Sequence, residues 1–170
     1  MPLIKPDSEI EDIMPETMQK DMEIKKKSII AAEMTFDAAH RLSNYQGKCK
    51  RIHGHTYKVI VEVSSKDLNE WGAVMDFGDL KKIMNNHIDQ RYDHKLLLYV
   101  DDPINKQIAD ALPDKDWVVW MNTNTTAEHI AQEIYIELKV VLRMNKAVRL
   151  ERVTVYETPK NAASYEEEEI

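Results

Sequence analysis

The chain has 170 residues, a length that suits one domain with a modest extension better than two catalytic domains. Hydrophobic residues make up 43% and charged residues 31%, so the chain can bury a core and is not disordered overall. The formal net charge of −7 argues against sequence-independent nucleic-acid binding and against a polybasic membrane anchor. We therefore expect neither nucleic acid nor a membrane among the partners.

Cysteine usage and hydropathy favour a cytoplasmic location. A chain with 1 cysteine cannot form an intrachain disulfide, which is typical of a reducing compartment. No apolar run approaches the roughly 18 residues that a membrane helix needs. The first residues show no basic segment followed by an apolar one, so we expect no secretory signal.

Composition divides the chain into three predicted parts. Residues 1–27 are proline-containing and rich in acids, and we expect an N-terminal extension there. The spacing of Ser8 and Glu11 within it fits either a short docked helix or a mobile arm. Residues 28–165 are expected to form the folded domain, and residues 166–170 an acidic tail.

Alternating hydrophobicity predicts two strands at the start of the domain. The faces of the first strand carry Met34, Phe36, Ala38 and His40 on one side, and Thr35, Asp37 and Arg41 on the other. One face of the second strand carries His53, His55, Tyr57, Val59, Val61 and Val63. Because a single loop joins the two strands, we expect an antiparallel pair.

The rest of the domain mixes helices with strands. Asp76 is a plausible N-cap for a helix that begins at Phe77, and residues 127–142 carry the clearest helical apolar stripe. Residues 117–121 are a candidate strand, and residues 153–157 alternate as a strand should. The fold class is therefore predicted as α+β, an antiparallel sheet with two main helices packed on one face.

Three histidines are candidate metal ligands. His53 and His55 alternate along one strand and so project to the same side, and His40 ends the preceding strand on the matching face. Three neutral imidazoles with one open position form the ligand set of a catalytic zinc. A satisfied polar histidine on a strand is the alternative for each one alone. The same set would also serve a zinc hydratase or hydrolase.

Cys49 lies four residues before His53, between Lys48 and the pair Lys50 and Arg51. Neighbouring cations favour the thiolate form, which is the form a reactive cysteine needs. An incidental surface thiol and a fourth zinc ligand are equally compatible with this spacing.

Two further carboxylate sites are candidates for chemistry. Asp93 and His94 could work together in proton transfer, although adjacent side chains usually diverge and a turn aspartate before a packed histidine is the alternative. Glu157 ends a strand on its apolar face, where it could accept hydrogen bonds from a ligand or form a rim salt bridge. Thr125 and Glu128 have the spacing of a helix capping box.

Taken in order, these motifs resemble the 6-pyruvoyl-tetrahydropterin synthase family. The resemblance covers roughly residues 29–165 and rests on Phe36-Asp37-Ala38-Ala39-His40, Cys49-x-x-x-His53-Gly54-His55, Met75-Asp76-Phe77-x-x-Leu80-Lys81, Asp93-His94-x-x-Leu97, Thr126-x-Glu128 and Glu157-Thr158-Pro159-x-x-x-Ala163-x-Tyr165. The last motif is most similar to the bacterial branch, the 6-carboxy-5,6,7,8-tetrahydropterin synthases that feed queuosine and other 7-deazapurines. The 6-pyruvoyl branch is the alternative.

The resemblance implies a zinc-dependent lyase that acts on 7,8-dihydroneopterin triphosphate. One zinc ion per subunit is expected on His40, His53 and His55. Cys49 then lies outside the coordination sphere as the proton-abstracting base, with Asp93 and His94 as its acid/base partners.

The resemblance also implies how the substrate is held and how the chain assembles. The pterin ring is expected on Glu157, Thr126 and Glu128. Separately from the resemblance, the clustering of Lys48, Lys50 and Arg51 suggests that they hold the triphosphate, with a solvated loop as the alternative. The implied architecture is the tunnelling fold (T-fold), whose units assemble into barrels, usually a homohexamer with active sites between subunits.

Overall fold

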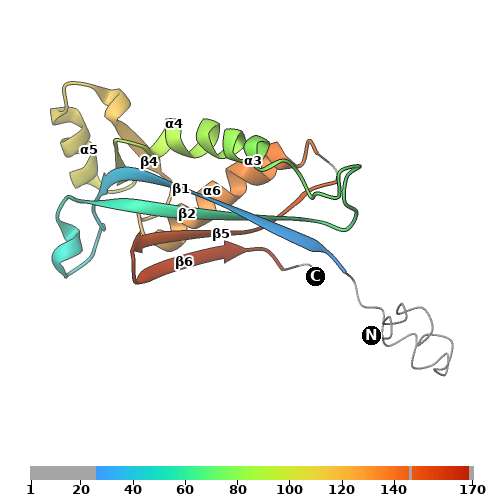
Figure 1. Ribbon diagram of the computed structural model, residues 1–170. Coiled ribbons are helices and arrows are strands. Elements are labelled where there is room, and N and C mark those ends of the chain that lie inside the picture. The colour runs from blue at the N-terminus through green and yellow to red at the C-terminus, as the bar shows by residue number, and fades with distance from the viewer. Residues whose placement is uncertain (1–25, 146, 169–170) are drawn as a thin grey trace, which may run out of the picture.

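The computed structural model describes residues 26–145 and 147–168. The predicted extension therefore lies outside the described residues except for Lys26 and Lys27, and so do the last two residues of the predicted acidic tail. The described chain forms one six-stranded sheet in the order β4-β3-β1-β2-β5-β6, with helices packed on it (Figure 1).

The two central strands confirm the predicted antiparallel pair. β1 (Ser28–His40) and β2 (His53–Ser65) pair along their whole length, with His40 opposite His53. Their inward faces are buried, as the alternation predicted, because every second side chain points into the core. This pairing fixes which residues meet at the end of the sheet where β1 stops.

The outer strands make the sheet mixed. β5 (Arg149–Thr158) pairs antiparallel with β2, and β6 (Asn161–Glu166) pairs antiparallel with β5. On the other side, β3 (Lys95–Tyr99) runs parallel to β1, and β4 (Val118–Met121) runs parallel to β3. The α+β class is confirmed, but the expected antiparallel pairing holds only for four of the six strands. Helical crossovers precede both β3 and β4, which is how parallel neighbours are connected.

Two helical segments cover the core, as predicted. The first comprises α3 (Phe77–Met84), the π-helical turn η2 (Asn85–Asp89) and α4 (Gln90–Tyr92); the second is α6 (Ala127–Leu142). The buried side chains of both helical segments belong to one cluster with the inward faces of β1, β2 and β5. None of the helices in the described part of the chain has the length and apolar character needed to cross a membrane.

One further helix, α5 (Pro103–Ala111), was not predicted from the sequence. Only Asn105 and Ala109 are buried in it, so this short helix contributes little to the core. It lies with the short 3-10 turn η1 (Lys48–Lys50) at the end of the sheet where β1 ends and β2 begins (Figure 1). A second 3-10 turn, η3 (Lys115–Trp117), leads into β4.

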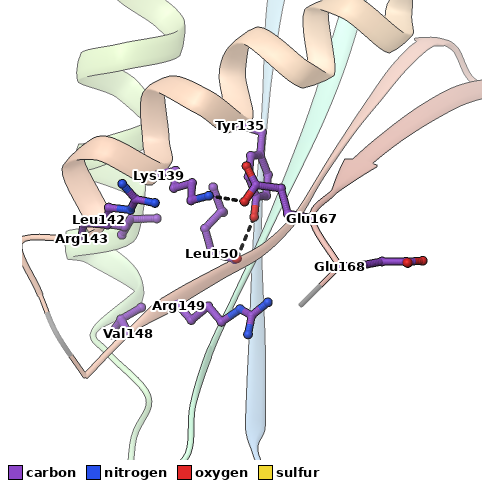
Figure 2. Close-up of a pocket in the computed structure, with 9 residues that line it drawn as sticks. All are labelled: Tyr135, Lys139, Leu142, Arg143, Val148, Arg149, Leu150, Glu167 and Glu168. Carbon is purple, nitrogen blue, oxygen red and sulfur yellow. Dashed lines mark hydrogen bonds and ion pairs between the residues drawn. The ribbon is translucent and has the colours of Figure 1, made fainter. Parts of the chain in front are cut away.

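Glu167 of the predicted acidic tail lies beside the end of α6 and the start of β5. Lys139 forms an ion pair with Glu167, and the hydroxyl of Tyr135 donates a hydrogen bond of 3.3 Å to the carbonyl oxygen of Leu150 (Figure 2). These residues border a cavity of about 310 Å³ beside the start of β5. The cavity is therefore distant from Glu157, which lies near the other end of the same strand.

The capping aspartate of α3 offers a test of local stability. The Asp76 side chain accepts a hydrogen bond of 2.6 Å from the backbone N–H of Gly78. We expect Asp76→Ala to lower the free energy of unfolding by about 1 kcal/mol, because this N–H loses its acceptor. Urea titration at a fixed protein concentration measures the change.

The matched control for that substitution is Asp79→Ala on the same helix. Asp79 is exposed and pairs with Lys82 at 3.1 Å, and such surface pairs contribute about 0.5 kcal/mol or less. Equal destabilisation by both substitutions would contradict the capping role of Asp76.

Candidate metal centre and adjoining pocket

The register of β1 and β2 gathers three imidazoles. His40 faces His53 directly, and His55 lies opposite Ala38, two residues further along β2. The Nε2 atoms of His40 and His53 are 3.1 Å apart, and one nitrogen from each of the three rings lies within 4.8 Å of the others. The structure thus brings together the three histidines that the sequence nominated as ligands.

The hydrogen-bond partners of two rings decide where their protons lie. Nδ1 of His40 is 2.7 Å from the carbonyl oxygen of Thr125, and Nδ1 of His53 is 2.8 Å from that of Arg51. A carbonyl oxygen only accepts hydrogen bonds, so each Nδ1 must carry the hydrogen. In the neutral rings both Nε2 atoms then present lone pairs to each other, an arrangement that a cation between them stabilises.

Burial favours the neutral form of His40 and His55. Desolvation lowers the pKa of His40, whose side chain is fully buried, and it also lowers the pKa of His55. Neutral imidazole is the form that binds a metal ion. In addition, Nε2 of His55 is buried and has no hydrogen-bond partner among the described residues.

The distances suit a tetrahedral ion. Zinc–nitrogen bonds of about 2.0–2.1 Å at tetrahedral angles place neighbouring ligand nitrogens about 3.3 Å apart. The 3.1 Å between the Nε2 atoms of His40 and His53 is close to that value. The residues present therefore fit a divalent ion such as zinc.

Glu157 lies beside the histidine group. Its Oε1 is 3.5 Å from Nε2 of His40 and 3.8 Å from Nε2 of His55. The histidines are the one group of three or more potential ligands that lie mutually close in the described part of the chain, and Glu157 is outside it. Its side chain is 29% exposed, so the carboxylate borders both the histidines and solvent.

A small cavity adjoins Glu157. It measures about 290 Å³ and is lined by Leu42, Thr126, Ala127, Glu128, Glu157, Asn161, Ala162 and Ala163. The three side chains expected to bind a pterin ring, Thr126, Glu128 and Glu157, thus share one cavity. Thr126 also caps α6, one residue later than the predicted capping box, because Thr125 instead donates its hydroxyl to the carbonyl oxygen of Arg41.

Cys49 lies in η1 and is half-buried. Its carbonyl oxygen accepts a hydrogen bond of 2.8 Å from the N–H of Leu42, and its sulfur is outside the histidine group. The flanking cations Lys48, Lys50 and Arg51 are all exposed.

Tyr57 is a site residue that the sequence argument treated only as core. Its ring meets the rings of His40 and His55 edge-on, at centroid distances of 5.9 Å and 5.5 Å. Burial, followed by the charges of Glu157 and Cys49, raises the pKa of Tyr57, so the phenol stays protonated. Its buried hydroxyl has no hydrogen-bond partner among the described residues. The sequence does indicate this position, because Tyr57 alternates with His53 and His55 along β2 and so shares their strand face.

Asp93 and His94 form a pair with each other. Asp93 accepts a hydrogen bond of 2.8 Å from the N–H of Asp37 and contacts Nδ1 of His94 at 2.5 Å. His94 has a left-handed backbone conformation, with φ of 56°, which lets these adjacent side chains meet. The hydrogen bond to Asp93 raises the pKa of His94, and the Asp37 N–H lowers the pKa of Asp93.

This pair does not reach the histidine group within one chain. The His94 side chain is 80% exposed rather than packed, which departs from the alternative of a buried histidine. The pair is anchored to the backbone N–H of Asp37, three residues before His40 in β1. Within the described residues, no hydrogen bond or ion pair links Asp93 or His94 to Cys49 or to the three histidines.

Comparisons with known proteins agree with this picture. A family model described as 6-pyruvoyl tetrahydropterin synthase matches residues 29–168. The 6-carboxy-5,6,7,8-tetrahydropterin synthase of Rickettsia felis is 34% identical over 125 residues, which are 73% of this chain and 89% of that protein. The enzyme of the same name from Haemophilus influenzae is 36% identical over 143 residues, covering 81% of this chain and 98% of the relative.

A solved structure shares the architecture. The 6-pyruvoyl tetrahydropterin synthase of Caenorhabditis elegans superposes with a TM-score of 0.61 at 26% identity, covering 85% of this chain and 98% of that one. This confirms the predicted tunnelling fold. The chain belongs to the 6-pyruvoyl tetrahydropterin synthase family, a family of pterin-forming enzymes.

Proposed function

We propose that the protein is a zinc-dependent 6-carboxy-5,6,7,8-tetrahydropterin synthase of 7-deazapurine (queuosine) biosynthesis. It would convert 7,8-dihydroneopterin triphosphate and water to 6-carboxytetrahydropterin, acetaldehyde and triphosphate. The observation that carries the proposal is the group of three mutually close imidazoles beside the cavity that holds Glu157. The bacterial relatives favour the carboxy product, whereas the name of the nematode structure keeps the 6-pyruvoyl product as the alternative.

His40, His53 and His55 would hold the zinc ion. A bound zinc ion supplies Lewis-acid stabilisation of negative charge on the side-chain oxygens of the substrate. The carbonyl oxygens of Thr125 and Arg51 orient two of the rings by accepting their Nδ1 hydrogens. Such support of the ligands fixes both the tautomer and the ring plane.

Cys49 would abstract the proton from the substrate carbon beside those oxygens. A thiolate in a half-buried turn next to exposed cations is suited to this role. Lys48, Lys50 and Arg51 would bind the triphosphate, since flexible exposed cations form charge-assisted hydrogen bonds with phosphate oxygens. The protonated phenol of Tyr57 packs edge-on against the rings of His40 and His55 and so would help to hold them in place.

The cavity beside Glu157 would hold the pterin ring. A carboxylate accepts hydrogen bonds only, so Glu157 and Glu128 suit the ring N–H and amino groups of a pterin. The hydroxyl of Thr126 can donate or accept and so would complete the polar lining.

Asp93 and His94 would return protons to the substrate from a neighbouring subunit. In one chain the pair forms no hydrogen bond or ion pair with Cys49 or the three histidines among the described residues, and His94 is exposed. A homo-oligomer, a hexamer by the family resemblance, would let His94 of one subunit meet Cys49 of the next. Asp93 stabilises the protonated form of His94 through their hydrogen bond.

The product decides between the carboxy and pyruvoyl branches. We expect the zinc-loaded protein to convert 7,8-dihydroneopterin triphosphate to 6-carboxytetrahydropterin with release of acetaldehyde, detected by mass spectrometry. Cys49→Ala should keep the zinc and the fold but lose at least about 100-fold in turnover, because the general base is gone. A 6-pyruvoyl product would assign the protein to the other branch. If Cys49→Ala is as active as the unsubstituted protein, the thiol is not the general base, and a zinc hydratase or hydrolase is favoured instead.

The histidine group predicts the metal content. We expect His53→Ala to lose most of its zinc after dialysis against a weak chelator, measured by elemental analysis, because a ligand and its tautomer-fixing contact to Arg51 are removed together. His87→Ala, in the π-helical turn outside the group, is the control and should retain one zinc per subunit. Retention of zinc by His53→Ala would rule out this ligand set.

The Asp93–His94 pair predicts a pH effect. Its hydrogen bond raises the pKa of His94 above the ordinary 6.5, so the protonated imidazole persists to higher pH. Asp93→Asn removes the charge but keeps an acceptor for the Asp37 N–H, so the alkaline limb of the kcat profile should move to lower pH. NMR titration of His94 should shift in the same direction.

The control for this pH effect is Asp101→Asn, which removes an exposed carboxylate beside Tyr99. It should leave the alkaline limb where it is in the unsubstituted protein. If the alkaline limb of the kcat profile is also unchanged in Asp93→Asn, His94 is excluded as the general acid.

A further inference from the structure

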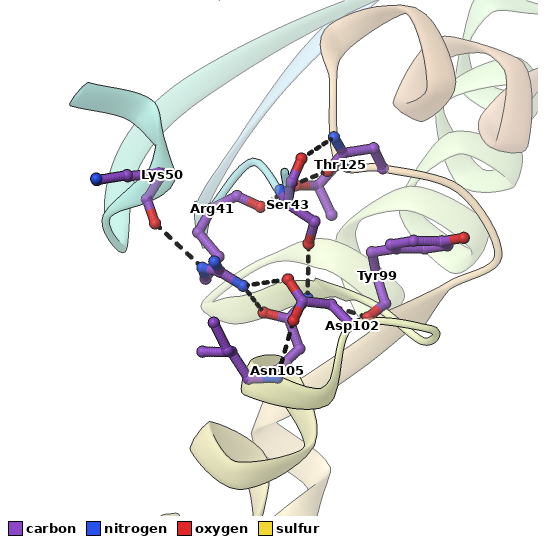
Figure 3. A network of polar contacts seen from close by, with 9 residues as sticks. Arg41, Ser43, Lys50, Tyr99, Asp102, Asn105 and Thr125 are labelled. Carbon is purple, nitrogen blue, oxygen red and sulfur yellow. Dashed lines mark hydrogen bonds and ion pairs between the residues drawn. The ribbon is translucent and has the colours of Figure 1, made fainter. Parts of the chain in front are cut away.

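Arg41 follows the last residue of β1 and is 7% exposed, although the strand alternation grouped it with the outward Thr35 and Asp37. β1 ends at His40, so the chain turns and the alternation no longer applies to the next residue. The guanidinium therefore points into a polar network between η1 and α5 (Figure 3).

One guanidinium joins three segments. Nη1 donates to Oδ2 of Asp102 at 2.6 Å and to Oδ1 of Asn105 at 2.5 Å. On its other edge, Nε donates to the carbonyl oxygen of Lys50 at 3.1 Å. The side chain thus connects the turn that carries Cys49 to the first residues of α5.

The α5 side of this connection is itself fixed. Oδ1 of Asp102 caps α5 by accepting from the N–H of Ile104 at 2.8 Å. Nδ2 of Asn105 donates to the carbonyl oxygen of Tyr99 at 3.0 Å, and Asn105 is fully buried. Arg41 therefore binds the turn to a rigid support.

The turn has little else to hold it. η1 contains only three residues and none of them is fully buried, with Cys49 half-buried. Its external backbone contacts are the hydrogen bond from the N–H of Leu42 to the carbonyl oxygen of Cys49 and the one from Arg41 to Lys50. Loss of the Arg41 contact would release one of these two attachments.

His40 is held by contacts that do not involve the Arg41 side chain. Its Nδ1 donates to the carbonyl oxygen of Thr125, and the Thr125 hydroxyl donates to the backbone carbonyl of Arg41 at 2.9 Å. Both contacts use backbone atoms that remain when the Arg41 side chain is changed. His53 is closer to the turn, because its Nδ1 is oriented by the carbonyl oxygen of Arg51, the residue that ends η1. A change in Arg41 should therefore act first on the thiol and less on the histidines.

We propose that Arg41 is a positioning residue that holds the Cys49 turn beside the histidine group through its bond to Lys50. The inference rests on the proposed function for its catalytic consequence, but the structural part concerns the turn alone. The fork geometry is essential, because one guanidinium donates from opposite edges to the turn and to α5. A lysine ammonium at this position would keep a cation near Asp102 but could not span both.

The test is Arg41→Lys, which retains the charge beside buried Asp102. We expect kcat to fall about 10- to 100-fold, the loss typical of a reacting group displaced by about 1 Å. KM and zinc content should change much less than kcat, because the cavity at Glu157 and the three histidine side chains are retained and the Thr125 contact of His40 does not involve the Arg41 side chain. Labelling by iodoacetamide should become several-fold faster, and it reports Cys49 alone because the chain has 1 cysteine.

Two further variants sharpen the result. Arg91→Lys makes the same chemical change where Arg91 pairs with Glu133 and Glu137 on α6, and it should alter neither kcat nor labelling. Asn105→Ala leaves Arg41 in place but removes one acceptor for its guanidinium, so labelling should accelerate less than in Arg41→Lys.

The possible results distinguish the positioning role of Arg41 from the proposed synthase function. Unchanged labelling in both Arg41→Lys and Asn105→Ala would overturn the positioning role. So would loss of zinc in proportion to loss of turnover, because Arg41 would then act through His40 or through the fold. Faster labelling with no synthase activity in any variant would support the positioning of Cys49 while contradicting the proposed function.

Discussion

The pairing of β1 with β2 is the constraint on which the candidate site depends. The buried side chains of Phe36, Tyr57 and Val59 set the register, because a slip by one residue would turn each of them to the opposite face. That same register places His40 opposite His53, at the point where both strands leave the core. The metal ligands are thus positioned by hydrophobic burial along the strands rather than by contacts between the histidines themselves.

The parts of the structure that the sequence predicted correctly are those where hydrophobic side chains recur with the period of a strand or a helix. Alternation alone located His40, His53 and His55 on matching faces, and helical spacing located α6. It missed β3 because buried parallel strands read as continuous apolar runs, and it missed α5 because that helix docks through Asn105. Tertiary polar contacts leave no period in the sequence.

The supporting contacts of the site were the least predictable part. Two of the three histidines are oriented by backbone carbonyl oxygens, those of Thr125 and Arg51, and any residue type would supply such an atom. Arg41 was assigned to the wrong face because its position beyond the strand end cannot be read from alternation. The ligands are therefore visible in the sequence, whereas the groups that orient them become visible only in the fold.

The exposure of the Asp93–His94 pair bears on assembly. The Cys49 turn and the histidine group share one end of the sheet, whereas the His94 side chain extends into solvent from a left-handed backbone conformation that non-glycine residues seldom adopt. Asp37 and Asp93 hold it there, although no contact among the described residues of the same chain uses the imidazole beyond Asp93. Under the proposed intersubunit site, this strained and exposed histidine acquires a function, because proton abstraction and proton return would then require two copies of the chain. Catalysis would be coupled to oligomerisation, and a folded, zinc-bound single subunit would still lack half of its proton-transfer groups.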